Sequence, residues 1–227
     1  MNEIIRGAVI AVALLSLSAG SVHAATWTVL GKTFQIKNPS TDASKRKVSG
    51  QALERGSNDG LVGDPTVNGA TLEVIANGGT PSDQTFALPK EGWSKIGTVG
   101  FQYSSRNSPG AVKKAKIKLT PSGTFQIRVL VLGKGGPVSV VPPNPGSDGG
   151  FILTLTMGDS YCVAFGGVAG GTTREDDNRR WYVTRPSAEA CPAPSCPPAQ
   201  PARAPAGHLA LPGPAGRAGP TYWARRR

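Results

Sequence analysis

Short apolar runs, separated by clusters of Gly, Pro, Asn and Asp, divide residues 25–190 into many small pieces. None of the runs has apolar residues at helical spacing, and the chain holds 30 glycines and 20 prolines in 227 residues. We therefore predict an all-β domain of about ten short strands, arranged as a β-sandwich or a jelly-roll-like fold. The expected strands cover residues 27–30, 33–37, 47–53, 70–76, 84–88, 99–103, 111–119, 124–132, 138–141, 151–157, 160–167 and 181–184.

Two hairpins are expected from the turn residues. Residues 27–30 and 33–37 flank Gly31-Lys32, and residues 111–119 and 124–132 flank a Pro-Ser-Gly turn. Residues 138–141 end at PPNPGSDGG, which we expect to stay outside a central strand because proline lacks the backbone donor.

Residues 151–167, FILTLTMGDSYCVAFGG, are predicted to form a central hairpin with Gly158-Asp159 as its two-residue turn. If Met157 and Ser160 close that turn, Phe151 lies opposite Gly166. Both faces of this pair are too apolar to lie open to water, so we expect an interior hairpin.

Residues 1–24 combine Arg6, the apolar run AVIAVALLSLSAG and the small-residue ending Val22-His23-Ala24. This pattern predicts a signal peptide, with the mature chain starting near Ala25 and no later membrane span. An uncleaved N-terminal anchor is the alternative. We expect the protein to be secreted, periplasmic or at the cell surface.

Residues 191–227 have a different composition, with nine prolines, nine alanines, five arginines and no acidic residue. Such a segment has little apolar surface to bury, and we predict a disordered tail after the 25–190 domain. It is either a basic, wall-associating tail or an out-of-frame end. The domain itself has 19 basic and 13 acidic residues, about +6, so the whole-chain charge of +11 overstates its basicity.

The three cysteines are consistent with export. Cys162 lies within the domain and Cys191 follows the last strand, so an oxidising compartment favours a disulfide between them. Cys196 would then be the odd thiol. The alternative is that Cys162 is a buried free thiol.

The residues of the domain do not suggest an enzyme or a cofactor site. The only histidines are His23 in the signal segment and His208 in the tail, which excludes histidine-based nucleophile pairs and histidine-ligated zinc in the domain. Its glutamates, such as Glu54, are scattered without the paired spacing that glycoside hydrolysis needs. The acidic residues 175–177 lack calcium-loop spacing, and we expect a self-neutralised surface loop with the neighbouring arginines.

One strand carries a distinctive charge pattern. With period two, Lys114, Lys116 and Lys118 share one face of the strand and stand ~7 Å apart, and Arg128 on the partner strand extends the row. Such a row could bind an acidic polysaccharide, a phosphate polymer or nucleic acid. The simpler interpretation is that these lysines protect an exposed sheet edge from aggregation.

The motifs GDPTVNGATLEV, LPKEGWSKIG with GFQYSS, KKAKIKL, and YCVAFGG before a terminal ACP resemble an exported β-rich domain that recurs in proteins of environmental bacteria. The resemblance covers residues 32–192 and implies no catalytic residues. Members often carry an extra cysteine pair around the KKAKIKL hairpin, which this chain lacks.

We therefore expect an exported, non-enzymatic structural or binding module. An alternative is a carbohydrate- or polyanion-binding domain that uses exposed aromatics, such as Trp93, Tyr103 and Trp181, or the lysine face. A hydrolase using unpaired carboxylates is the third hypothesis. The expected partner is an acidic polysaccharide or another cell-envelope polymer rather than nucleic acid.

Overall fold

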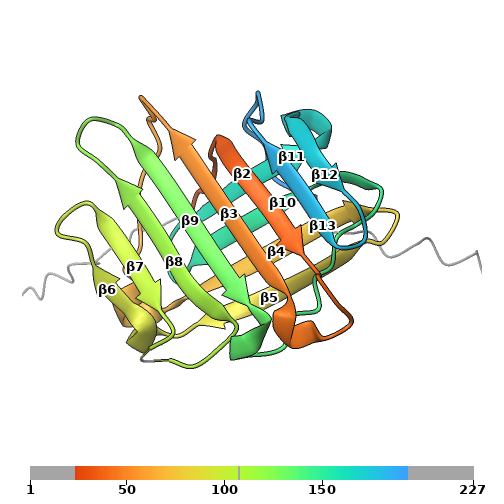
Figure 1. Cartoon of the computed structure of the whole chain (residues 1–227). Helices are drawn as coiled ribbons and strands as arrows, with labels where there is room; N and C mark the ends of the chain where they lie inside the picture. The colour runs from red at the N-terminus through yellow and green to blue at the C-terminus, as the bar shows by residue number, and fades with distance from the viewer. Residues whose placement is uncertain (1–23, 107, 194–227) are drawn as a thin grey trace, which may run out of the picture. The chain divides into compact units, whose positions relative to one another are not determined.

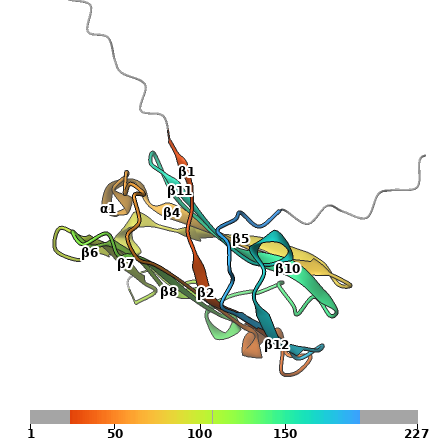
Figure 2. The same ribbon diagram turned by 90° about the horizontal axis from the view of Figure 1, so that it is seen from above.

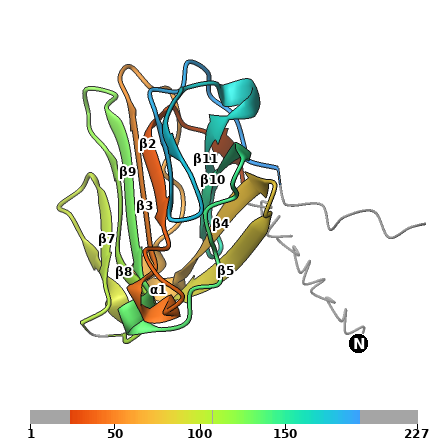
Figure 3. The same ribbon diagram turned by 45° about the vertical axis from the view of Figure 1, so that its right-hand side comes forward.

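The computed structural model describes residues 24–106 and 108–193, which form two β-sheets packed face to face (Figure 1). This confirms the all-β sandwich. The two layers are seen side by side in Figure 3. The predicted signal segment, except Ala24, and the tail after Ala193 lie outside the described residues.

The larger sheet has eight strands in the order β12-β13-β2-β3-β9-β8-β7-β6, and every neighbouring pair is antiparallel. Its strands are β2 (Gly31–Lys37), β3 (Lys47–Glu54), β6 (Trp93–Lys95), β7 (Gly100–Ser104), β8 (Val112–Leu119), β9 (Phe125–Leu132), β12 (Thr172–Asp176) and β13 (Arg180–Thr184).

The smaller sheet has five strands in the order β1-β11-β10-β4-β5. Its strands are β1 (Thr26–Thr28), β4 (Ala70–Gly78), β5 (Ser82–Leu88), β10 (Gly146–Leu155) and β11 (Ser160–Gly166). The connections contain one short helix, α1 (Pro65–Asn68), and four 3₁₀ turns at Ala43–Lys45, Lys90–Gly92, Gly133–Gly135 and Gly167–Ala169.

The core lies between the sheets and is built from the side chains that face inward at every second position of the strands. Phe34 of β2 is at its centre, with ring centroids 5.3 Å from Phe165 and 5.7 Å from Trp181. Gly50 of β3 faces Phe151 of β10, and a Cβ added at Gly50 would lie only 2.4 Å from the ring. This glycine therefore makes room for the aromatic ring of the opposite layer.

The predicted opening hairpin is wrong. β1 pairs in parallel with β11 in the smaller sheet, whereas β2 lies in the larger sheet between β3 and β13. Figure 2 shows β1 beside β11 and β2 in the other layer. Val29 and Leu30 therefore cross between layers instead of forming a tight turn.

The hairpin of β10 and β11 is present and interior, but its predicted register is wrong. Phe151 pairs with Val163 rather than Gly166, and Leu153 pairs with Tyr161. The turn is longer than two residues, because the Leu155 nitrogen donates to the Asp159 carbonyl at 2.9 Å. Asp159 does not belong to an exposed turn. Its carboxylate is buried and accepts three hydrogen bonds from elsewhere in the fold.

The region around residues 138–150 also differs from expectation. Residues 138–141 form no strand, although they lie along the edge strand β5, where Ser82 and Gln84 side chains bond to their backbone. β10 begins at Gly146, so the glycine-rich half of PPNPGSDGG enters a central strand after the prolines end.

Within the described parts of the chain, no helix has the length and apolar character needed to cross a bilayer.

Candidate functional site

The lysine row lies on the outer face of the larger sheet. Lys114, Lys116 and Lys118 point away from the core, while Ala115 and Ile117 between them are buried. The period-two placement predicted for this strand is therefore present.

The interpretation of these lysines as edge protection is wrong. β8 pairs with β7 on one side and β9 on the other, and the edges of this sheet are β6 and β12. The lysines thus stand well inside a sheet face, where strand-edge aggregation gives no reason for them.

Arg128 extends the row across the strands, as predicted. It lies directly opposite Lys116 in the β8–β9 pair, and its other cross-strand neighbour is Gln51 of β3. The same register places one polar residue on each of seven neighbouring strands: Thr184, Thr33, Gln51, Arg128, Lys116, Gln102 and Ser94.

This face is hollowed over β3, β9, β8 and β7, in a concavity of about 790 Å³. Lys114, Lys116 and Arg128 line it, but Lys118 does not and lies farther along the strand. The other polar side chains of the lining are Ser49, Gln51, Ser94, Gln102, Tyr103, Ser104, Arg106 and Lys113. We call this concavity the basic hollow; no carboxylate belongs to its lining.

Two basic residues of the hollow, Lys113 and Arg106, were not predicted from the sequence. Lys113 precedes the alternating row, but a β-bulge between Val112 and Lys114 leaves both Lys113 and Lys114 exposed. The doubled lysine of KKAK was the available signal. Arg106 lies in the turn after β7, where the strand pattern carries no information about direction.

Acidic groups do not neutralise the hollow. The described residues form two ion pairs, Lys95 with Asp64 at 3.0 Å and Arg180 with Glu175, and neither involves a residue of the basic hollow. The second pair confirms that a neighbouring arginine neutralises part of the 175–177 cluster, but the predicted loop is wrong for Glu175 and Asp176, which lie in strand β12.

The three aromatics considered for sugar stacking are in the core. Trp93, Tyr103 and Trp181 are 6%, 3% and 1% exposed. Trp93 and Tyr103 pack edge to face at 5.5 Å, and the Trp93 indole donates to the Leu88 carbonyl. These residues therefore offer no exposed aromatic platform, which corrects the part of that alternative that relied on aromatic side chains.

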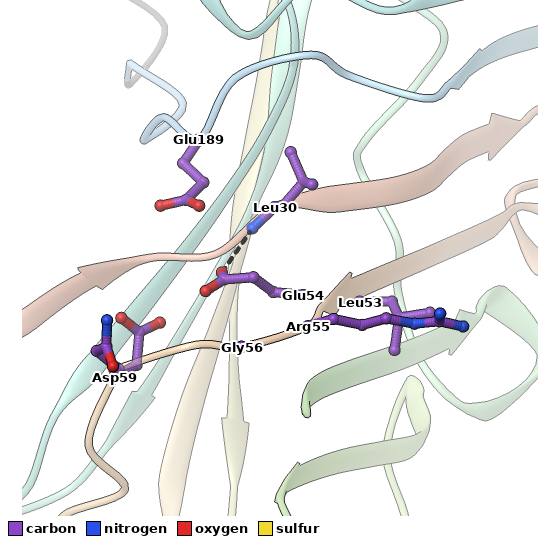
Figure 4. Close-up of a pocket in the computed structure, with 8 residues that line it drawn as sticks. Leu30, Leu53, Glu54, Arg55, Gly56, Asp59 and Glu189 are labelled. Carbon is purple, nitrogen blue, oxygen red and sulfur yellow. Dashed lines mark hydrogen bonds between the residues drawn. The ribbon is translucent and has the colours of Figure 1, made fainter. Parts of the chain in front are cut away.

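A second pocket, of about 690 Å³, brings together carboxylates that the sequence shows only as scattered residues (Figure 4). Glu54, Asp59 and Glu189 line it beside Arg55. Glu54 accepts a hydrogen bond from the Leu30 nitrogen at 3.3 Å. The pocket lies where the end of β3 meets the crossing from β1 to β2 and the segment before Cys191.

The carboxyl group of Asp59 in this second pocket is partly buried and lies near other negative charges. Burial, followed by the charges of Glu54 and Glu189, raises the pKa of its carboxyl, while a hydrogen bond with Ser57 acts in the opposite direction. One of its oxygens is fully buried with no hydrogen-bond partner.

The predicted cysteine pair is at disulfide distance. Cys162 on β11 and Cys191 form a bridge with their Cα atoms 4.7 Å apart, which attaches the segment after β13 to the smaller sheet. The same segment is held by backbone bonds from Ser187 and Ala188 to the Ala169 carbonyl.

No group of three or more His, Cys, Asp or Glu side chains is placed to hold a metal ion in the described part of the chain. No protein-family model, curated protein or solved structure matches the chain. The resemblance to an exported β-rich domain therefore stays a prediction.

Proposed function

We propose that this protein is a non-enzymatic, exported binding module that holds an anionic polysaccharide on the outer face of its eight-stranded sheet. One observation carries the proposal. Five basic side chains line the basic hollow, no carboxylate lines it, and none of them is used in an ion pair among the described residues. A surface of one sign attracts and concentrates ligands of the opposite sign.

The neutral side chains of the hollow favour a sugar polymer over a simple phosphate chain. Gln51 and Gln102 each present an amide that both donates and accepts, and the serine hydroxyls do the same. Sugar hydroxyls need such two-way partners, whereas the ammonium and guanidinium groups suit carboxylates or sulfates.

Nucleic acid fits the surface less well. Proteins that hold single strands stack the bases on exposed aromatic side chains. Tyr103 is the one aromatic residue that lines the hollow, and it is almost fully buried and packed against Trp93.

The charged face also extends beyond the hollow, as an extended ligand would require. Lys118 continues the row along β8. Lys37 and Lys47 are cross-strand neighbours on the same outer face, at the end of β2 and the start of β3.

An array of polymers at two salt concentrations tests the proposal. It should include carboxylated, sulfated and neutral polysaccharides, polyphosphate and single-stranded DNA. We expect binding to the carboxylated or sulfated sugars that weakens with salt, because exposed charges are screened. Binding to polyphosphate and DNA alone would replace the sugar with a phosphate polymer, and binding to nothing would favour a structural module.

A further inference from the structure

Asp159 is a buried carboxylate with three donors and no cation. It is 1% exposed in the turn between β10 and β11. Its Oδ1 accepts from the Ala25 nitrogen at 2.9 Å, and its Oδ2 accepts from the Trp27 indole at 2.9 Å and the Val62 nitrogen at 3.3 Å. All three donors are neutral in the continuous chain, and no ion pair of the described residues includes Asp159.

A buried carboxylate normally needs a positive partner. Desolvation of a charge costs several kcal/mol, and neutral hydrogen bonds offset only part of it. Burial of the Asp159 carboxylate therefore destabilises the fold unless one of its donors carries a positive charge in the functional protein.

Ala25 is the donor that can acquire a charge. Ala24 is exposed, whereas Ala25 is half-buried and its carbonyl accepts from the Ser160 nitrogen at 2.8 Å. The parallel pairing with β11 begins at the next residue, Thr26. The chain thus passes from an exposed to an anchored position at the Ala24–Ala25 bond.

We propose that the chain is cut between Ala24 and Ala25, and that Asp159 is the binding site for the α-ammonium group so produced. Hydrolysis by a peptidase of the export route breaks the peptide C–N bond. Water supplies the hydroxyl to the Ala24 carbonyl carbon and a proton to the Ala25 nitrogen, which takes a second proton from solvent. The donor already 2.9 Å from Oδ1 then becomes one half of a buried ion pair.

The ion pair would link cleavage of the Ala24–Ala25 bond to the residues that are packed around Asp159. Asp159 also holds the Val62 nitrogen, and Tyr161 next to it donates to the Gly60 carbonyl at 3.2 Å. Gly60 and Val62 belong to the loop between β3 and α1, which also contains Asp59 of the second pocket. This inference is independent of the ligand proposed for the basic hollow.

Three forms of the otherwise complete chain test the inference: residues 25–227 with a free amine, the same chain acetylated at Ala25, and residues 24–227. An amine-reactive label, located by peptide mass, measures the accessibility of the α-amino group. We expect the free Ala25 amine of the folded chain to react about tenfold more slowly than in urea, since a paired and buried amine is protected. The acetylated and extended forms should unfold at lower urea concentrations.

Asp159→Asn in residues 25–227 should restore labelling of the α-amine. Because that variant could fail to fold, the acetylated and extended forms, which keep Asp159, provide an independent comparison. Equal unfolding midpoints of all three forms, together with unprotected Ala25, would overturn the inference. An intact mass of the exported protein that corresponds to a first residue other than Ala25 would overturn the inference as well.

Discussion

Lys116 on β8 and Arg128 on β9 lie directly opposite each other on the outer face of the larger sheet. Like charges in this position destabilise a strand pair, by about 0.2–1 kcal/mol. A chain that keeps them there, away from the sheet edge, has a feature that stability alone does not explain. Binding of an anion between the two side chains would explain it.

Replacement of Arg128 by Gln should have opposite effects on the stability of the fold and on polymer binding. We expect Arg128→Gln to raise the free energy of unfolding slightly, by no more than about 1 kcal/mol, because the like-charge contact with Lys116 is removed. The same change should weaken binding of the anionic polymer. Urea denaturation and a binding titration of one preparation measure both effects.

Lys134→Gln is the matched control, since Lys134 is exposed in the turn after β9 and does not line the hollow. It should leave both quantities unchanged. A loss of stability in Arg128→Gln would show that the pair is not repulsive.

Gly50 should be intolerant of a side chain. Gly50→Ala places a Cβ against the Phe151 ring, and overpacking of this kind costs about 1–3 kcal/mol. Gly110→Ala is a suitable control, because a Cβ there meets nothing within 4 Å and its φ is not in the left-handed region. Thermal and urea unfolding of the two variants should differ, and Phe151→Leu should recover part of the loss at Gly50. Equal stability of the two alanine variants would contradict this packing.

The disulfide should be a major stabilising contact. Replacement of Cys162 and Cys191 together by Ala should cost about 2–5 kcal/mol of unfolding free energy. The oxidised, denatured wild-type chain should titrate a single thiol, although it has three cysteines. Three free thiols in protein from an oxidising compartment would exclude the bridge.

Asp59 should destabilise the folded protein once it is ionised. Its pKa is raised above 3.8 on folding, so the folded state binds more protons and stability falls as pH rises from that value through the folded pKa. Asp59→Asn should therefore be more stable than wild type at neutral pH, by less than about 1 kcal/mol given the exposure of the site. The difference should disappear near pH 3.

Asp64 should show the opposite pH dependence of stability. Hydrogen bonds from Thr66 and Lys95 lower the pKa of its carboxyl, so Asp64 contributes stability above its ordinary pKa that is lost as pH falls. Asp64→Asn should therefore lose stability at neutral pH. Parallel pH profiles for the two asparagine variants would contradict this assignment.

The fold class and several local features could be predicted because they depend on residues close in sequence. Alternation places Ala115 and Ile117 in the core and the lysines outside. A single cysteine within the domain left Cys191 as the simplest partner for Cys162.

Features that depend on distant contacts could not be predicted. The turn signal at Gly158-Asp159 gave the wrong register because the Asp159 side chain binds Ala25, Trp27 and Val62 instead of solvent. The pocket of Glu54 and Glu189 joins residues more than a hundred positions apart, which no spacing rule can detect.

Salt-dependent binding to an anionic polysaccharide, compared between two triple variants, shows whether the basic hollow is the binding surface. Lys114→Ala/Lys116→Ala/Arg128→Ala removes three basic residues of the hollow, and Lys90→Ala/Lys134→Ala/Arg179→Ala removes the same charge from exposed positions outside it. At ~0.5 kcal/mol for each contact, the first variant should lose about tenfold in affinity. The second should retain most of its affinity and the same salt dependence as wild type. Equal losses in the two folded variants, or no binding by wild type to any carboxylated or sulfated polymer, would exclude the basic hollow as the binding surface.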